Sequence, residues 1–296
     1  MRNWIDLHMH SFYSSDGTYS PAELIGLCKA AGLKVVALTD HNAIAGVAEM
    51  MRCGQQIGIE VIPGSEFDCQ FEGRFLHILC YGVDPQDERI HRHAAMIHNI
   101  ELDAARQILD KAKKLGLFFE EEKVLALSRD GTVCGEMIAE VALADPRNAE
   151  SELLKPYRPG GQRSNNPFVN FYWDHCSPGK AAYVYMDYPP FERVMELIEA
   201  VGGTAVLAHP GANVGHDAAY IRKLQSCGVV GLEVYSSYHS AEDIGYFLQA
   251  AHELGLFVTV GSDFHGKTKP AVRMADFELE NQQDILNTFL RFVRAR

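Results

Sequence analysis

The sequence predicts an α/β barrel interrupted by an inserted, mainly helical cap. Short apolar runs alternate with helical patterns over residues 1–88, and the same alternation returns over residues 189–296. The intervening residues 89–188 do not follow it. Strands that alternate with helices form parallel sheets through βαβ units. A chain of 296 residues is long enough for one large domain that carries such an insertion.

The first barrel segment begins with a strand in WIDLHMH, followed by a helix in SPAELIGLCKAAGL. Ser20, Pro21 and Glu23 form a capping-box pattern with proline in the first turn of that helix. KVVALTDH is a continuous apolar run, as expected for a strand covered on both faces. A helix in IAGVAEMMRCGQQIG and strands in EVIPGSEF and FLHILCYGVD complete the segment.

The insertion opens with a long helical stretch over residues 88–115, and shorter helices follow to about Leu143. Residues 145–180 are rich in proline and glycine and predict an irregular loop, whose stretch NPFVNFYWDHC is too apolar for disorder. The second barrel segment then alternates again, with strands expected in TAVLAHPG, GVVGLEVYSS and LFVTVGSDFHG and a closing helix in NQQDILNTFLRFVRAR.

Composition narrows the classes of function. The formal charge of −12 and the lack of a basic stripe disfavour binding to polymeric nucleic acid, although bound cations would offset local carboxylates. No apolar run approaches the roughly 18 residues of a membrane span, and the first residues do not resemble a signal peptide. Seven scattered cysteines without a CxxC pair predict reduced thiols in the cytoplasm.

Polar side chains recur where the predicted strands end. His8 and His10 lie two residues apart, so they share one face of the first strand, and Asp263 and His265 repeat this spacing at the last strand. Active sites of α/β barrels are built at the carboxyl ends of the strands. The other ligand-type residues at these ends, with one in the loop after the first strand, are Asp16, His41, Glu66, His77 and His209.

A single histidine at a strand end is usually a packing residue, but this set is too large and too regular for that explanation. Such groups are costly to enclose unless they are paired or bound to metal. The remaining histidines lack defensible ligand spacing and are predicted to lie outside the cluster: His91, His93, His98, His175, His216 and His252. Imidazole with carboxylate suits zinc, iron(II) or manganese. Nine such ligands suit two or three ions and phosphoryl chemistry.

The ordered set HxH, Asp16, TDH, PGxE, His77, AHPG and SDxH resembles the polymerase and histidinol phosphatase (PHP) family over residues 4–84 and 190–268. The resemblance implies a distorted (β/α)7 barrel with three divalent metal ions. The first ion would take His8, His10, Glu66 and Asp263. Glu66 would bridge to a second ion bound by His77 and His209, and the third would take Asp16, His41 and His265.

An aspartate at position 16 and the inserted cap resemble the branch of the family that acts on small phosphorylated molecules. The implied function is a phosphoesterase in which hydroxide generated at the metals attacks phosphorus. The favoured substrate is 5-phosphoribosyl 1,2-cyclic phosphate, because the turn after AHPG carries Ala212, Asn213 and Val214 where related nucleotide phosphatases tend to have arginine. The alternatives are a nucleoside 3′,5′-bisphosphate, the 5′ end of an oligonucleotide, or a non-enzymatic metal-binding module.

Roles outside the metal set are also predicted. His239 is a candidate general acid for the leaving alkoxide, with holding its own loop as the alternative. Asp263 is expected to be essential for turnover. Arg158, Arg163 and Lys180 are candidates for binding a distal phosphate, against the alternative of solvated surface charges. Asp40 is a candidate hydrogen-bond partner of a ligating imidazole. Tyr172 and Trp173 are candidates for stacking on a base or sugar, with aromatic packing under the cap loop as the alternative. The oligomeric state is left open.

Overall fold

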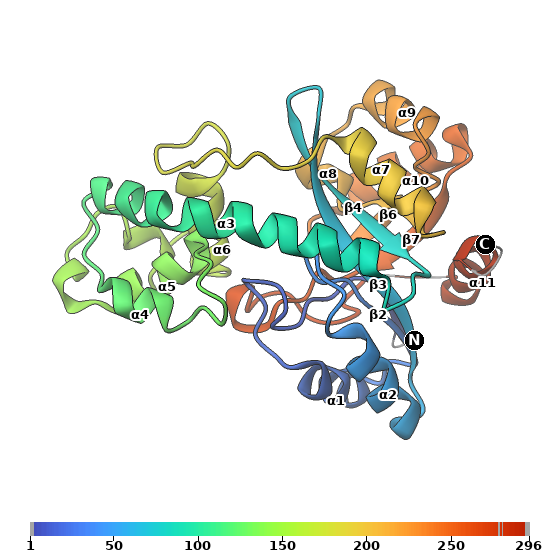
Figure 1. Cartoon of the computed structure of the whole chain (residues 1–296), viewed down its shortest axis with the longest axis horizontal. Coiled ribbons are helices and arrows are strands. Elements are labelled where there is room, and N and C mark those ends of the chain that lie inside the picture. Colours follow the sequence, from blue (N-terminus) through green and yellow to red (C-terminus); the bar gives the residue numbers. More distant parts are fainter. Residues whose placement is uncertain (1–2, 278, 280, 294–296) are drawn as a thin grey trace.

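The computed structural model describes residues 3–277, 279 and 281–293. Seven strands form one sheet in sequence order, with helices packed around it, so the predicted α/β barrel is confirmed (Figure 1). The strands are β1 (Ile5–Asp6), β2 (Val35–Leu38), β3 (Glu60–Phe71), β4 (Arg74–Tyr81), β5 (Thr204–Leu207), β6 (Gly231–Ser236) and β7 (Phe257–Gly261).

One strand departs from the parallel pairing that the alternation predicts. β4 is antiparallel to both β3 and β5, whereas the other neighbouring strands are parallel. The turn between β3 and β4 is only Glu72 and Gly73, with φ of 46° and 78°, and a two-residue turn of positive φ forms a tight hairpin. The sequence pattern predicts His77 at the carboxyl end of a parallel strand. In the structure it lies in the middle of a strand that runs in the opposite direction.

The first and last strands meet and bring the two ends of the sheet together. The Leu7 amide donates to the Val260 carbonyl at 2.9 Å, and the Asp263 amide donates to the His8 carbonyl at 2.8 Å. Met9 and Phe264 form a further parallel bridge. Residues that follow β1 and residues that follow β7 are consequently neighbours at one end of the barrel.

Helices of the barrel cover the sheet. They are α1 (Pro21–Ala31), α2 (Val47–Ile57), α7 (Phe191–Ala200), α8 (Pro210–Asn213), α9 (Ala218–Ser226), α10 (Ala241–Leu254) and α11 (Gln282–Val293). The predicted capping box of α1 is confirmed, because the Ser20 and Glu23 side chains each accept a hydrogen bond from the other residue's backbone amide. A similar box between Ser240 and Asp243 begins α10.

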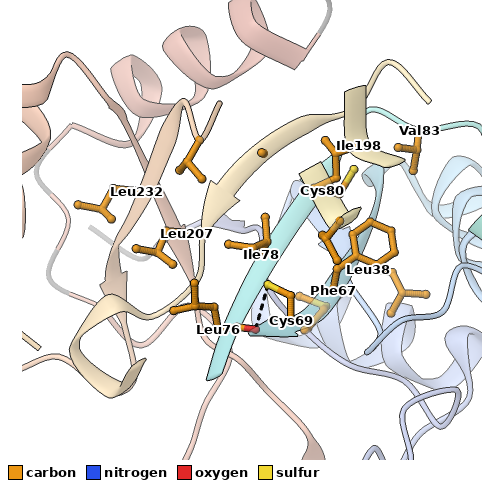
Figure 2. Packing of buried hydrophobic residues seen from close by; sticks show 14 of the residues in the cluster. Leu38, Phe67, Cys69, Leu76, Ile78, Cys80, Val83, Ile198, Leu207 and Leu232 are labelled. Carbon is orange, nitrogen blue, oxygen red and sulfur yellow. Dashed lines mark hydrogen bonds between the residues drawn. The ribbon is translucent and has the colours of Figure 1, made fainter. Parts of the chain in front are cut away.

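Two apolar layers give the barrel its core. In β2, Val36 and Leu38 pack with the surrounding helices, whereas Val35 and Ala37 join the cluster around Tyr81 and Phe289, as alternation along a strand requires. Figure 2 shows part of the layer between the sheet and the helices, where buried side chains of β3 and β4 pack near Ile198 of α7 and Leu207 of β5 extends the layer.

The insertion has a hydrophobic core of its own. Its regular elements are α3 (Glu88–Lys114), α4 (Glu121–Leu125), α5 (Gly135–Ala144), 3-10 turns at Pro146–Asn148 and Lys155–Tyr157, and α6 (Pro167–Phe171), which continues into a π-helical turn, η3 (Tyr172–Cys176). The aromatic stretch predicted to be irregular is thus partly helical, since Pro167 suits a helix start and Phe171 is fully buried in this core.

Helix α3 connects the insertion to the barrel, and Figure 1 shows it running from one to the other. Ile90, near its start, belongs to the barrel core, whereas Ala104 to Ala112 belong to the core of the insertion. Because one continuous helix serves both cores, the proposed boundaries at residues 88/89 and 188/189 stay predictions.

Within the described residues, no helix combines the length and the apolar character needed to cross a lipid bilayer. All seven cysteines are free thiols. The cytoplasmic location expected from their pattern stays a prediction.

Candidate metal centre

Nine histidines and carboxylates predicted from the sequence converge at one end of the barrel. They come from the segment after β1, the residues after β2, β5 and β7, and the interiors of β3 and β4. Three groups among them place donor atoms within 4.8 Å of one another: His8, His10, Glu66 and Asp263; His41, Glu66 and His77; and His10, His41 and His265.

The first group is the most compact. The Nε2 atoms of His8 and His10 lie 3.1 Å apart, and both are within 3.2 Å of Glu66 Oε2. Asp263 Oδ1 is 3.4 Å from His8 Nε2 and 3.1 Å from His10 Nε2. Two imidazole nitrogens that face each other and share two carboxylate oxygens match the arrangement of ligands around one cation.

Glu66 lies at the centre of the cluster. Its Oε2 faces the first group, and its Oε1 lies 3.0 Å from His77 Nδ1 and 3.1 Å from His209 Nε2. A carboxylate with its two oxygens in two sets of imidazoles has the geometry of a bridging ligand. The Glu66 side chain itself is fully buried, so it is shielded from bulk water.

The third group closes the other side of the cluster. The rings of His10 and His265 stack with centroids 3.9 Å apart, and His265 Nε2 lies 3.2 Å from Asp16 Oδ2. His41 belongs both to this group and to the group around Glu66 and His77. The family resemblance implied His41 at one metal only, whereas its side chain belongs to two of the donor groups.

Unsatisfied buried atoms test whether these residues fit metal ions. Asp16 Oδ1, His41 Nδ1, Asp263 Oδ1 and His265 Nε2 are all buried without a hydrogen-bond partner. Leaving a buried polar atom unpaired costs about 1–3 kcal/mol, and more for a charged group. Asp16 Oδ1, Asp263 Oδ1 and His265 Nε2 are explained if each donates to a cation, while His41 Nδ1 faces Asp68 Oδ1 at 3.4 Å, so the residues fit a metal centre.

Electrostatics hold His10 and Glu66 in ligating forms. At His8 and His41 burial lowers the pKa, but the surrounding carboxylates outweigh it and raise the pKa well above its usual value, so a bound cation would displace a proton from each ring. Burial, together with the neighbouring His265 and His41, lowers the pKa of His10 to about 4. Burial would raise the pKa of the Glu66 carboxyl, but His8, His77 and His41 outweigh it and hold that pKa well below its usual range. A neutral imidazole beside ionised carboxylates is the donor set that a divalent cation requires.

Two buried carboxylates orient the imidazoles from behind. Glu233 on β6 contacts His8 Nδ1 at 2.9 Å through one oxygen and accepts the His209 amide at 2.8 Å through the other. Asp40, predicted as a partner of a ligating imidazole, acts through Ser14, whose hydroxyl donates to Asp40 Oδ1 at 3.1 Å and lies 2.9 Å from His10 Nδ1. Such partners fix ring orientation and tautomer.

Comparison with known proteins identifies the family. The sequence model of the PHP domain matches residues 6–158. The chain belongs to the PHP domain family. A 3′,5′-nucleoside bisphosphate phosphatase from Chromobacterium violaceum is 31% identical to it, covering 88% of this chain and 87% of that protein.

Other relatives carry different activities. A 5′-3′ exoribonuclease from Haemophilus influenzae is 30% identical, covering 88% of this chain and 89% of that protein. A phosphoribosyl 1,2-cyclic phosphate 1,2-diphosphodiesterase from Eggerthella lenta is 28% identical, covering 88% and 94%. A Chromobacterium violaceum structure described as an amidohydrolase with bound sulfate and no metal has a TM-score of 0.77 at 26% identity, covering 96% of each chain. This PHP protein is a metal-dependent phosphoesterase.

The cluster of candidate metal ligands opens into a cavity of about 450 Å³ that lies between the barrel and the insertion. Barrel residues form one wall, including Asp16, His41, His77, His209 and Asp263. Aromatic residues line it as well: Phe75 of β4, Tyr172 and Trp173 of η3, and Tyr183 and Tyr188 of the segment that returns to the barrel. A cavity of this size is typical of small-molecule sites.

Lys269 was missed by the sequence analysis. It is only 5% exposed, and its ammonium contacts the Asp263 carboxylate and, at 2.9 Å, the Tyr238 hydroxyl. Burial favours the neutral amine, but Asp263 dominates and raises the pKa of Lys269, so it carries a positive charge. Its position four residues beyond the SDxH motif offered no signal, because an isolated lysine in a loop is usually solvated.

The three predicted distal-phosphate contacts lie apart from the metal donors. Arg163 lines an adjoining cavity of about 320 Å³, where its guanidinium binds Asp174 through two contacts of 2.9 and 3.0 Å. Arg158 donates to the Leu143 and Asn148 carbonyls at 3.3 and 2.8 Å and so supports the insertion's own fold. Lys180 is exposed and does not line either cavity.

The position of His239 favours its structural alternative. Its Nδ1 donates to the Val234 carbonyl at 2.7 Å, and its Nε2 accepts the Gly211 amide at 2.9 Å. Both ring nitrogens are therefore engaged with backbone, which leaves no proton directed at the cluster. Among the described residues, the other six histidines also stay outside the donor groups, as predicted.

Proposed function

We propose that this PHP phosphoesterase hydrolyses a small phosphorylated ribose compound, and that its substrate is 5-phosphoribosyl 1,2-cyclic phosphate. The observation that carries the proposal is the placement of the donor groups in one wall of a cavity of about 450 Å³ whose opposite wall is the insertion. Such a cavity suits a metabolite and not a polymer. The net charge of −12 supports the same class.

Three divalent ions, manganese, iron or zinc, are proposed for the cluster. The first would be held by His8, His10, Glu66 and Asp263; the second by Glu66, His77 and His209; and the third by Asp16, His41 and His265. Ions held there would polarise phosphoryl oxygens and lower the pKa of water. The protein would contribute orientation through Glu233, and positive charge toward a phosphoryl oxygen through Lys269.

The cations available to the substrate favour a compact phosphate ester. Of the described residues that line the main cavity, Lys269 and Arg74 carry fixed positive charge. The turn after His209 supplies Ala212 and Asn213 to the cavity and no basic side chain. 5-Phosphoribosyl 1,2-cyclic phosphate carries two phosphate groups, the cyclic diester and the 5-phosphate, and Lys269 and Arg74 would supply one cation for each. The relative from Eggerthella lenta acts on a compound of this kind by its name.

A nucleoside 3′,5′-bisphosphate is the second candidate. The aromatic side chains of the cavity favour it, because Tyr172 and Trp173 offer faces on which a base stacks. The Chromobacterium violaceum relative is named for this activity. An oligonucleotide 5′ end has less support, since Arg163 is already paired with Asp174 and leaves little positive charge beyond the cavity.

The test is product analysis with manganese-loaded protein and three substrates in parallel: 5-phosphoribosyl 1,2-cyclic phosphate, adenosine 3′,5′-bisphosphate and a short 5′-phosphorylated oligoribonucleotide. Ring opening with the other two compounds intact supports the proposal. Phosphate release from the bisphosphate alone replaces it with the second candidate. If none of the three is hydrolysed, while generic phosphate esters are, a ribose phosphate is the wrong substrate class.

A further inference from the structure

We propose that Asp68 is a positioning residue that couples two metal sites of the centre. Its carboxylate would accept hydrogen bonds from the imidazoles of His77 and His41, which belong to the proposed second and third sites respectively. The inference rests on the proposed metal ligands, and it adds a residue that the ligand pattern of the sequence does not contain.

Asp68 lies at the right place on β3. It follows Glu66 by two residues, so both side chains point to the same face of the strand. In the hairpin register Asp68 is directly opposite His77. Asp68 is 6% exposed, and its Oδ1 lies 3.4 Å from His77 Nε2 and 3.4 Å from His41 Nδ1.

The other carboxylate oxygen is held by Asn42. The Asn42 side-chain amide donates to Asp68 Oδ2 at 2.7 Å, and its carbonyl oxygen accepts the Asp68 amide at 3.0 Å. Asn42 has a φ of 50°, a left-handed conformation that asparagine tolerates better than most residues. This reciprocal pair fixes the carboxylate and leaves Oδ1, which has no hydrogen-bond partner, facing the two imidazoles.

The geometry of His77 shows why an acceptor is needed. Its Nδ1 lies 3.0 Å from Glu66 Oε1, and its Nε2 faces Asp68. Ligation through Nδ1 requires the proton to reside on Nε2, where Asp68 accepts it. A carboxylate behind a ligating histidine fixes the tautomer and ring orientation and increases ligand basicity.

His41 places the same oxygen in contact with the next site. Its Nδ1 is 3.4 Å from Asp68 Oδ1 and 3.4 Å from Glu66 Oε2, and the residue is also part of the group with His10 and His265. One oxygen that orients both rings makes the second and third sites depend on each other. The first site, where Glu233 supports His8, has its own carboxylate.

Helix α3 braces this arrangement from outside. His93 Nε2 contacts Asn42 Oδ1 at 3.3 Å, and its ring meets the Phe67 ring edge-on. The chain of contacts thus runs from α3 through Asn42 and Asp68 to two imidazoles of the centre. The HxH pattern of α3 therefore supplies one histidine that supports the centre from a distance.

The experiment compares the wild type, Asp68→Ala, Asp68→Asn, the ligand variant Glu66→Gln and the matched control Asp217→Asn. The control removes the carboxylate that binds the half-buried Arg74 of the cavity wall, away from the donor groups, and it serves as a control for metal binding and not for substrate binding. Each protein is stripped with chelator and titrated with Mn²⁺, with free Mn²⁺ followed by electron paramagnetic resonance and bound metal by elemental analysis. We expect Asp68→Ala to bind two of its ions about 10–100-fold more weakly while the first ion and the control stay unchanged.

The outcomes separate this inference from the proposed function. A wild type that binds no manganese at this centre and hydrolyses no phosphate ester overturns the proposed function. An active wild type with Asp68→Ala of equal manganese stoichiometry and affinity overturns the positioning role alone. Asp68→Asn keeps a carbonyl acceptor and should lie between the wild type and Asp68→Ala. If Asp68→Asn binds manganese as weakly as Glu66→Gln does, Asp68 is itself a ligand and the positioning role is wrong.

Discussion

Replacing Lys269 with methionine tests the phosphoryl end of the site. The Lys269 ammonium contacts Asp263, which is also a proposed metal ligand. Once Asp263 donates to a divalent ion, the ammonium faces positive charge, and an incoming anion restores the balance. Lys269 also lines both cavities, so its charge is accessible to a substrate. We therefore expect this lysine to bind a phosphoryl oxygen.

The magnitude follows from the kind of bond that is lost. A hydrogen bond to a charged group contributes about 1.5–3 kcal/mol, and every 1.4 kcal/mol changes a rate or binding constant about tenfold. Because Lys269 is almost fully buried, solvent screens this contact little. Lys269→Met should therefore lower kcat/KM by roughly 10- to 150-fold. Methionine keeps the length of the side chain and limits the packing change.

The assay is phosphate release under manganese saturation, with bound metal quantified in every sample. Lys267→Met is the matched control, because Lys267 is an exposed neighbour that binds Glu140 at 2.9 Å. We expect the control to retain wild-type kcat/KM. Full activity in Lys269→Met with normal metal content would refute the reasoning. A fall in activity that matches a fall in bound metal would show that Lys269 only supports Asp263.

Three further predictions concern the carboxylates and the metals. Asp263→Asn should abolish turnover while the circular dichroism of the metal-free protein stays unchanged, because asparagine tolerates the φ of 56° at this position. Manganese at 100 times its Kd should contribute about 2.7 kcal/mol to the free energy of unfolding. Removing it with a chelator should therefore lower Tm by on the order of 5 °C, and adding manganese back should restore the Tm fully. Burial raises the pKa of Glu101 from 4.5 to about 7. The metal-free wild type should therefore lose stability relative to Glu101→Gln as the pH rises between these values, by on the order of 3 kcal/mol. Urea unfolding of both proteins at pH 5 and pH 8 measures this, and a constant difference between them would contradict the burial argument.

The convergence of the nine candidate ligands could be predicted because it follows from local rules. Residues two apart on a strand share a face, and the ends of neighbouring parallel strands lie together. HxH after β1 and DxH after β7 become neighbours as soon as the sheet closes. The capping box at Ser20 was equally local, since its donors and acceptors lie within four residues.

The reversal of β4 was missed although its signal is in the sequence. Only seven residues, DCQFEGR, separate the two predicted strands, and parallel strands need a crossover of a dozen or more residues. Lys269, Glu233 and Asp68 were missed for another reason. Each is a single charged residue without a motif, and its burial depends on contacts with distant segments.

The residues of the insertion that contact the substrate could not be predicted from the sequence. The predicted Arg158, Arg163 and Lys180 were chosen for charge and for proximity in sequence to a loop. In the structure Arg163 is neutralised by Asp174, and Arg158 binds backbone carbonyls. Whether a basic residue faces a cavity depends on the packing of α5, α6 and η3, which hydrophobic periodicity alone does not define.

The reversed hairpin has a consequence for both metal and substrate. Because β4 is antiparallel, its first residues lie at the end of the barrel where the parallel strands finish, so His77 reaches the cluster from mid-strand. The same hairpin carries Glu66 and Asp68, and its tip places Arg74 and Phe75 in the cavity wall. Arg74 and Glu72 then bind Asp217 and Lys223 near and on α9. Changes at the hairpin tip should therefore alter substrate binding first, whereas changes four or more residues from the turn should alter metal binding.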